Sequence, residues 1–236
     1  MVREDIEGEL VSLVTAYVRE KESEVLGALD AYNRGRTESK VFAQDTIAID
    51  LGKILDPRVI KAKVIELFTR ITHLGHDDLE KQINRNIEFN PSFNQAVGEQ
   101  GFKLIKGASD DLIQKLQNDL LEGWQRGEGI NELKERVRTV WSNGHFTEAR
   151  LEMIARTESV RAYNLAKHKA AENSGLRYKK TWIAVRDSRT GPDTKLLDRQ
   201  VRELHEFFHD TYNKKLVSMP PNRPNCRCTL KYTPII

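Results

Sequence analysis

The sequence contains one short motif whose residue types and spacing could support catalysis. His205, Glu206 and His209 spell H-E-x-x-H within "LHEFFHD". On a helix, histidines four residues apart point to one side and can bind zinc, while the glutamate supplies a general base. The following residues, "DTYNKK", hold no third histidine at the spacing of the extended protease motif. A zinc metalloprotease is therefore one hypothesis, and a chance match on a charged helix surface is the interpretation that we favour.

The two cysteines form a second candidate site. Cys226 and Cys228 are separated by one residue, so a disulfide between them would close a small, strained ring, and a reducing compartment fits this usage. On a strand their side chains would face the same way and could supply half of a zinc cage, with His205 and His209 as the other half. The alternative is a pair of small buried apolar side chains. We expect no metal and no other cofactor, with zinc at these four residues as the alternative.

A polar stripe marks the most regular helical segment of the sequence. Thr157, Arg161 and Asn164 lie at i, i+4 and i+7 of "ARTESVRAYN", and Arg156 and Glu158 flank Thr157. Such a stripe is commonly exposed to solvent. Here a strand and a polar turn follow it, so an internal cluster of hydrogen bonds and ion pairs is the competing interpretation.

The turn "DSRT" offers partners for that stripe. Asp187 would pair with Arg156 or Arg161, and Arg189 would pair with Glu158. These contacts would attach the long helix to the C-terminal part of the chain.

The elements that position these residues can be predicted from periodicity and capping residues. Asp56 before Pro57 predicts a helix start, Asp77 and Glu80 have the spacing of a capping box, and Asn90-Pro91 marks a turn. Helices are expected over residues 1–30, 55–71, 76–83, 92–105, 108–124, 130–141, 147–174 and 196–215. Thr147 is the expected N-cap of the helix over residues 147–174, and Gly175 is its expected end. Alternation predicts strands over residues 176–187 and 226–232.

These elements predict a predominantly helical α+β protein. We expect a helical region over residues 1–145 and a small α+β domain with a short sheet over residues 146–236. No apolar run is long enough to cross a bilayer, and "MVREDIEGEL" has no apolar core, so we expect neither a membrane span nor a signal peptide. The chain is expected to act inside a cell, or inside something built in a cell.

The charge is distributed unevenly along the chain. Residues 1–120 carry 16 Lys and Arg against 21 Asp and Glu, a balance of −5, whereas residues 121–236 carry 22 against 14, a balance of +8. The C-terminal half is therefore the part expected to meet phosphate, and a sequence-independent DNA-binding protein is a second alternative function. A mixed solvated surface explains the same numbers, because the basic residues are scattered.

The ordered motifs of the C-terminal half resemble the phage Mu F-like minor head (head morphogenesis) protein family of tailed bacteriophages. The resemblance covers about residues 120 to 233 and rests on an R-T-E helix, a strand with Lys and Trp, a D-x-R-T turn, an L-D element and a closing P-N-C-R-C. The matching residues are Arg156, Thr157, Glu158, Asn164, Lys180, Trp182, Asp187, Arg189, Thr190, Pro192, Leu197, Asp198, Pro221, Pro224, Asn225, Cys226, Arg227 and Cys228.

The chain departs from the family pattern at one group of positions. Many members carry C-P-x-C after the R-T and a His before P-N-C-R-C, which together suggest a zinc cage. Gly191, Thr194 and Arg223 stand in those places here. The H-E-x-x-H motif is not a family motif.

The resemblance implies a structural role in a virion. It implies a minor head protein that associates with the portal and acts in procapsid and head morphogenesis, with a possible part in DNA packaging or ejection. Its partners would be the portal protein, capsid or scaffold components and packaged double-stranded DNA, with no membrane. Its location would be the inside of the head near the portal, and the host cytoplasm during assembly. The matching residues would form a structural cluster, and none would be catalytic.

Overall fold

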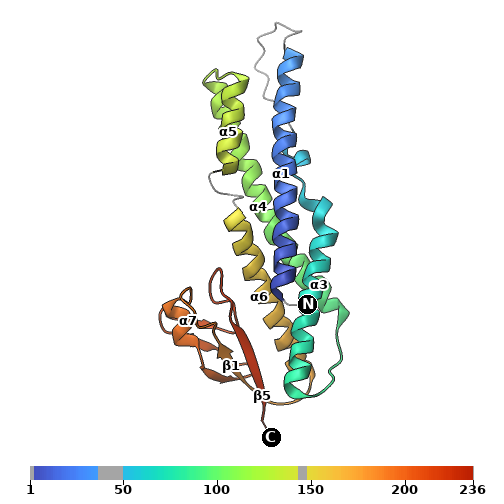
Figure 1. Ribbon diagram of the computed structural model, residues 1–236, viewed down its shortest axis with the longest axis vertical. Coiled ribbons are helices and arrows are strands. Elements are labelled where there is room, and N and C mark those ends of the chain that lie inside the picture. The colour runs from blue at the N-terminus through green and yellow to red at the C-terminus, as the bar shows by residue number, and fades with distance from the viewer. Residues whose placement is uncertain (1–2, 37–49, 143–147, 236) are drawn as a thin grey trace. The chain divides into compact units, whose positions relative to one another are not determined.

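The structure, a computed structural model, describes residues 3–36, 50–142 and 148–235 (Figure 1). The chain contains two compact units, and each is described by itself. The first comprises Met1–Leu10, Lys63–Gly101 and Glu152–Ile236, and the second comprises Val11–Ala62 and Phe102–Leu151. The sequence-based division at residue 145 stays a prediction.

Helices dominate the described residues, and a small antiparallel sheet follows them, as predicted. The helices are α1 (Arg3–Arg36), α2 (Leu51–Ile54), a 3-10 turn (Pro57–Ile60), α3 (Lys61–Ile83), α4 (Pro91–Gln125), α5 (Ile130–Ser142), α6 (Glu148–Asn173) and α7 (Pro192–Leu197). No described helix is both long and apolar enough to span a membrane.

Three of the predicted helix boundaries are confirmed by their capping contacts. The Asp56 carboxylate accepts the Arg58 N–H at 3.0 Å, and Pro57 opens the turn that leads into α3. The Asn90 side chain accepts the Ser92 N–H at 3.0 Å where α4 begins. Gly175, with φ of +70°, ends α6 in the left-handed conformation that glycine adopts without strain. The expected N-cap at Thr147 lies outside the described residues.

Two predicted helix breaks were wrong. The sequence predicted a new helix at residues 76–83, but α3 continues to Ile83 because His76 and Leu79 are buried on its inner face. Residues 92–105 and 108–124 were predicted as separate helices and instead form the single helix α4. Residues 106 and 107, where the break was predicted, lie inside α4. Earlier in the same helix, a Cβ on Gly101 would lie 2.2 Å from the Phe68 ring of α3. Gly101 therefore lets α3 and α4 approach closely.

The sheet of the first unit places the C-terminal strand next to the strand that follows α6. Strands β1 (Tyr178–Ile183), β2 (Val201–Glu203) and β5 (Thr229–Pro234) pair antiparallel in the order β2-β1-β5, and β3 (Phe208–Asp210) pairs with β4 (Lys215–Val217) (Figure 1). The predicted strand at 176–187 is confirmed as β1. The predicted terminal strand begins three residues later than expected, at Thr229.

One face of β1 is buried. Tyr178, Lys180 and Trp182 alternate with more exposed residues, as the period of a strand requires. Trp182 pairs with Leu230 of β5, and its ring meets Phe208 edge-on at 5.2 Å between centroids. Ala170 and Ala171 of α6 belong to the same apolar cluster, so the helix packs against this face.

The predicted helix at residues 196–215 was wrong, and this error matters for the site. The segment contains the end of α7, the short strands β2 and β3, the turns before and after them, and the first residue of β4. Leu197, Leu204 and Phe208 are all buried, and their spacing of seven and four mimics a helix. The hairpin of β3 and β4 satisfies the backbone of 208–217 instead.

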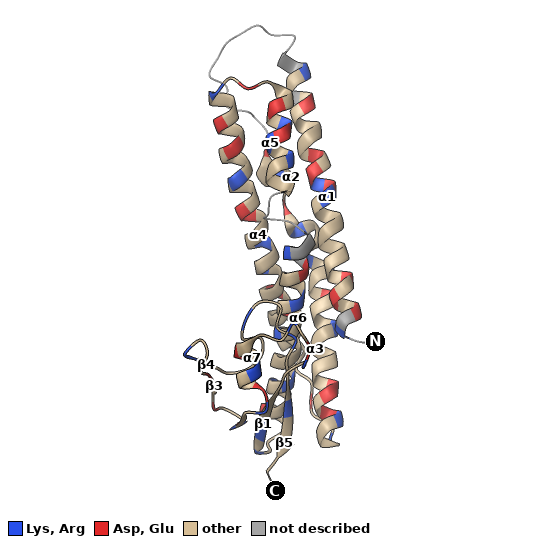
Figure 2. Cartoon of the chain, turned by 60° about the vertical axis from the view of Figure 1, so that its left-hand side comes forward, with Lys and Arg blue, Asp and Glu red and all other residues tan. Residues whose placement is uncertain are grey.

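The second unit is a helical assembly with a charged exterior. Leu133 and Val137 of α5 are buried, as the predicted amphipathic helix at 130–141 requires. A bidentate ion pair joins Arg136 to Glu128, with both N–O distances at 2.6 Å. Figure 2 shows residues of both charge signs along α4, where Lys115 pairs with Asp119. The exterior of this helix is a mixed surface rather than a block of one sign.

Candidate functional site

The centre of the candidate site is the side-chain amide of Asn164 on α6. Asn164 is fully buried, its oxygen accepts the Leu230 N–H at 3.0 Å, and its nitrogen donates to the Cys228 carbonyl oxygen at 3.2 Å. The nitrogen also donates to the Val160 carbonyl oxygen at 2.9 Å. One side chain therefore satisfies two buried backbone groups of the closing segment and joins α6 to the entrance of β5.

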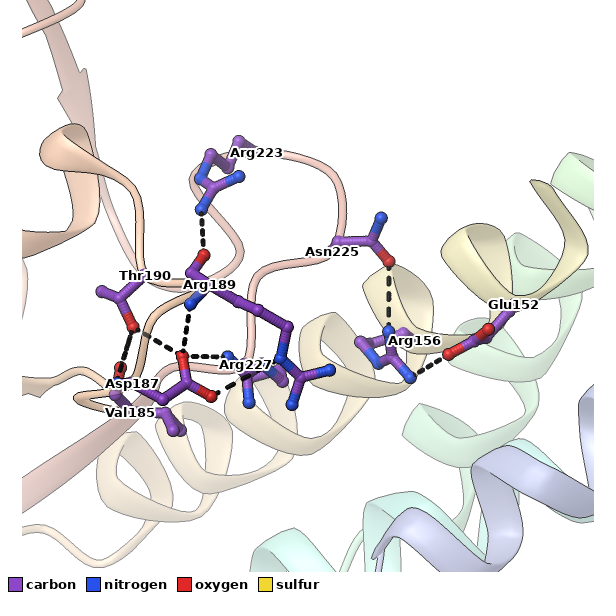
Figure 3. Close-up of polar contacts among 9 residues, drawn as sticks. All are labelled: Glu152, Arg156, Val185, Asp187, Arg189, Thr190, Arg223, Asn225 and Arg227. Carbon is purple, nitrogen blue, oxygen red and sulfur yellow. Dashed lines mark hydrogen bonds and ion pairs between the residues drawn. The ribbon is translucent and has the colours of Figure 1, made fainter. Parts of the chain in front are cut away.

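Thr157 makes a second link, about two helical turns nearer to the start of α6. Its hydroxyl accepts the Asn225 N–H at 3.0 Å and donates to the Met153 carbonyl oxygen at 2.6 Å. Asn225 has φ of +59°, and its side-chain oxygen accepts from Arg156 at 3.4 Å (Figure 3). The P-N-C-R-C segment is thus held against α6 at both its asparagine and its second cysteine. We call these contacts, from Thr157 to Asn225 and from Asn164 to Cys228 and Leu230, the latch.

Lys167 extends the latch, although the sequence did not single it out. Its ammonium is fully buried and donates to the Leu230 carbonyl oxygen at 2.7 Å and to Asp78 of α3 at 2.6 Å. Burial lowers the pKa of Lys167, and the Asp78 carboxylate opposes that shift. Burial also works to raise the pKa of Asp78, but hydrogen bonds from Lys167 and Tyr163 outweigh it, so this pKa lies below its ordinary value. The ion pair between Lys167 and Asp78 and the contact of Lys167 with Leu230 tie α3, α6 and β5 together.

The turn after β1 is built around Asp187. Its carboxylate accepts from the Arg227 guanidinium at 2.7 Å and from the Arg189 N–H at 3.0 Å (Figure 3). The Thr190 hydroxyl accepts the Asp187 N–H at 3.3 Å and donates to the Val185 carbonyl oxygen. The hydrogen bond from Arg227 holds the pKa of Asp187 well below its ordinary range. Asp187 is therefore an ionised anchor for the closing segment.

Asp198 fixes the other side of this turn. One carboxylate oxygen accepts the Ala184 N–H at 2.9 Å, and the other accepts from Arg186 at 2.6 Å. Burial works to raise the pKa of Asp198, but these two hydrogen bonds outweigh it and the pKa lies below its ordinary value. The L-D element thus ties the end of α7 to the end of β1.

The predicted pairs between the helix stripe and the turn were wrong. Arg156 and Arg161 do not pair with Asp187, and Glu158 does not pair with Arg189. Arg227 occupies the place beside Asp187, because the closing segment runs between the turn and α6. The cluster exists, but the closing segment supplies its central cation.

Arg156 and Arg161 have partners nearer to α6. Arg156 pairs with Glu7 of α1 at 2.9 Å and with Glu152 one turn earlier in α6. Arg161 pairs with Glu158 at 3.0 Å. Glu7 is buried, so the first residues of α1 are tied to α6 within the first unit.

The two cysteines are buried, reduced and part of the apolar cluster around Trp182. A hydrogen bond from Cys228 lowers the pKa of Cys226, while the same contact and burial raise the pKa of Cys228. Both thiols face the core while Arg227 between them reaches Asp187. The predicted same-side arrangement of the two thiols is therefore present, although residues 226–228 precede the strand.

A polar cluster surrounds Gly191, Thr194 and Arg223, the positions at which the family pattern predicts further zinc ligands. The Asp193 carboxylate lies 3.2 Å from the Arg223 guanidinium and accepts from Asn222 at 2.8 Å. A Cβ on Gly191 would lie 2.8 Å from the Arg223 guanidinium. A guanidinium has no lone pair to offer a metal, and glycine has no side-chain donor. These residues do not fit a zinc cage with Cys226 and Cys228.

The H-E-x-x-H residues lie on a turn and a strand instead of a helix. His205 is in the turn after β2, His209 is on β3, and the Glu206 carboxylate accepts the Glu203 N–H at 2.9 Å. The helical arrangement that the metalloprotease hypothesis requires is therefore not formed. Within the described ranges, potential metal ligands converge in threes at His168, Glu172 and His205, and at His76, Asp77 and Glu80. His209, Cys226 and Cys228 are in neither group.

A known protein family matches the part of the chain that contains the latch. The family described as "Phage Mu protein F like protein" matches residues 114–231, which is half of the chain and includes every latch residue. This chain belongs to the phage Mu protein F-like family. Membership indicates a bacteriophage head morphogenesis protein.

One curated protein that is similar to part of this chain is named as an enzyme. The chain is 27% identical over 166 residues to a protein of Enterococcus faecalis named NAD(+)--arginine ADP-ribosyltransferase EFV. The matched region covers 66% of this chain and 31% of that protein, so the chain spans about a third of its relative. No solved structure matches the chain.

Proposed function

We propose that this chain is a minor head protein of a tailed bacteriophage that associates with the portal and takes part in procapsid assembly. The observation that carries the proposal is the latch. The side chains of the family motif are used to satisfy backbone groups of their own fold, as Asn164 does for Leu230 and Cys228. Residues used in this way stabilise the fold. We therefore expect the protein to act through partners that bind its surface.

The surface proposed to engage the portal or shell is the acidic helical part. Residues 1–120 carry a balance of −5, and Asp110 and Asp111 lie exposed on α4. Charged residues on a surface raise the rate of association with a partner of opposite charge. The proposed location follows: the inside of the head near the portal, and the host cytoplasm during assembly.

Packaged double-stranded DNA is the second proposed partner. Residues 121–236 carry a balance of +8, and contacts to phosphate would be independent of base sequence. Such contacts would accompany DNA packaging or ejection. We expect filter binding to linear DNA whose affinity falls linearly with salt on logarithmic axes; no retention at low salt would remove DNA from the partners.

Co-expression with the portal and major capsid proteins of the same phage tests the assembly role. We expect the chain to copurify with the portal, and the double variant Asp110→Lys and Asp111→Lys to weaken this association. The matched control is Lys231→Glu, a charge reversal at an exposed position of β5. A wild-type chain that stays monomeric and binds neither portal nor capsid protein would overturn the proposal.

A further inference from the structure

Three potential metal ligands converge where the last turns of α6 meet the turn between β2 and β3. His168 and Glu172 are four residues apart on α6, and His205 comes from the turn. The His168 Nε2 atom lies 3.3 Å from Glu172 Oε1, and the His205 Nδ1 atom lies 3.8 Å from the same oxygen. All three ligand atoms lie within 4.8 Å of one another.

We propose that His168, Glu172 and His205 form a binding site for a divalent transition metal ion, with zinc as the biological ligand. Imidazole nitrogen and carboxylate oxygen are the donors that zinc takes at bond lengths of about 2.0–2.2 Å. Ligand atoms around a tetrahedral ion at such distances are about 3.4 Å apart. The two separations to Glu172 therefore need only small side-chain adjustments to accept the ion.

His168 is held in the orientation that a ligand requires. It is buried, and its Nδ1 atom lies 3.1 Å from the Tyr232 hydroxyl of β5. When Nε2 binds the ion, Nδ1–H donates to the Tyr232 oxygen, which fixes both the tautomer and the ring. Burial lowers the pKa of His168, which favours the neutral imidazole that binds a metal ion.

Two lysines set the charge around the site. Lys169 donates to the second oxygen of Glu172 at 2.6 Å, which leaves Oε1 directed at the histidines. Lys180 is buried nearby and donates to the Ser218 carbonyl oxygen at 3.0 Å, and burial lowers its pKa to about 8. The Glu206 carboxylate also faces Lys180 and favours its charged form. The nearby cations limit the affinity, and the single carboxylate favours a divalent ion over a trivalent one.

The site is open to solvent on the side of His205. The His205 side chain is 76% exposed, whereas that of Glu172 is 25% exposed. An ion can therefore enter without unfolding, and three protein ligands leave one tetrahedral position for water or another ligand. This assignment uses one histidine of H-E-x-x-H and gives no ligand role to His209 or Glu206.

Metal titration of the full-length chain tests the proposal. After chelator treatment and desalting, we expect Zn²⁺ to bind with one equivalent per chain in calorimetry and to raise Tm until that equivalent is reached. His205→Ala and Glu172→Gln should each weaken binding by at least about 10–100-fold. His209→Ala is the matched control from the same motif and should bind as the wild type does. The melting temperatures of all three metal-free variants establish that they fold.

Cobalt substitution distinguishes this site from the cysteines. Co²⁺ bound to two imidazoles and a carboxylate should give visible d–d bands without a thiolate-to-metal charge-transfer band, and His205→Ala should abolish them. A thiolate band that disappears in Cys226→Ser would place the ion at the cysteines and overturn the proposal. Loss of binding in His209→Ala but not in Glu172→Gln would also overturn it, as would the absence of saturable binding in the wild type.

Discussion

The side-chain oxygen of Asn164 accepts the backbone N–H of Leu230 at 3.0 Å, so a helix residue takes the place of a strand neighbour at the entrance of β5. The same amide donates to the Cys228 carbonyl oxygen. Asparagine suits this position because one short side chain carries both an acceptor and a donor. The relationship also explains why the asparagine of the helix and the closing P-N-C-R-C segment occur together in one sequence.

Replacing Asn164 by Ala should lower the free energy of unfolding by about 2–4 kcal/mol, because two buried backbone groups lose their partner. Chemical denaturation followed by circular dichroism measures the change. Asn118→Ala is the matched control, since Asn118 lies exposed in the interior of α4, and its effect should stay within about 0.5 kcal/mol. Equal stability of the two variants would show that the latch does not support the fold.

Replacing Arg156 by Ala should destabilise the protein by about 1–3 kcal/mol, because the buried carboxylate of Glu7 loses its guanidinium partner. The double variant Arg156→Met and Glu7→Gln should recover part of the loss, since it removes the buried charge as well. Thermal unfolding of Arg156→Met, Glu7→Gln and their double variant gives the coupling between the two residues. Additive effects would mean that the ion pair contributes nothing of its own.

Stability should fall in acid partly because of Asp187. Its pKa in the folded state lies below the unfolded value of about 3.9, since Arg227 stabilises the charged form. The contribution is therefore complete above about pH 4 and is lost as the pH falls from there toward the folded-state pKa. Asp187→Asn should flatten the dependence of Tm on pH below about 4. In an Arg227→Met background the same substitution should change that dependence less, and identical slopes in all variants would contradict the pairing.

Gly101→Ala should destabilise the first unit by about 1–3 kcal/mol through overpacking against Phe68. The comparison is Gly107→Ala in the same helix, where an added Cβ meets nothing within 4 Å. That substitution should stabilise the protein by about 0.5–1 kcal/mol, because alanine favours a helix interior. Melting temperatures that move in opposite directions would support the close approach of α3 and α4, and a shift in the same direction would refute it.

The sequence predicted elements well where the local signals and the tertiary contacts agree. Asp56 with Pro57, Asn90 with Pro91, and Gly175 each act within a few residues of the boundary that they set. The helix over 196–215 was mispredicted because buried residues brought together by turns had helical spacing. Three-residue strands are too short to show an alternation that would have corrected it.

The sequence predicted which residues form the cluster, but not which of them contact one another. The motif placed Thr157 and Asn164 on one helix face, and the structure uses both in the latch. Arg227 could not be assigned to Asp187, because such a pair depends on the path of a loop 40 residues away in sequence. Lys167 shares the face of Asn164 at i+3, and a lysine on a face of otherwise small residues was the available signal. No sequence pattern near Lys167 indicates that its partner is Asp78, which is 89 residues away.

The antiparallel sheet has a consequence for how the chain acquires its structure during translation. β1 lies between β2 and β5, and its register with β5 joins Tyr178 to Pro234. The strand β5 must therefore leave the ribosome before β1 gains its second neighbour. Likewise, Glu7 can pair with Arg156 only after a further 149 residues have been synthesised. Hydrogen bonds within a helix are local in sequence, so the helices of the second unit can form earlier. A nascent chain paused before β5 should be sensitive to protease in residues 178–217, and this sensitivity should disappear when synthesis passes the closing segment.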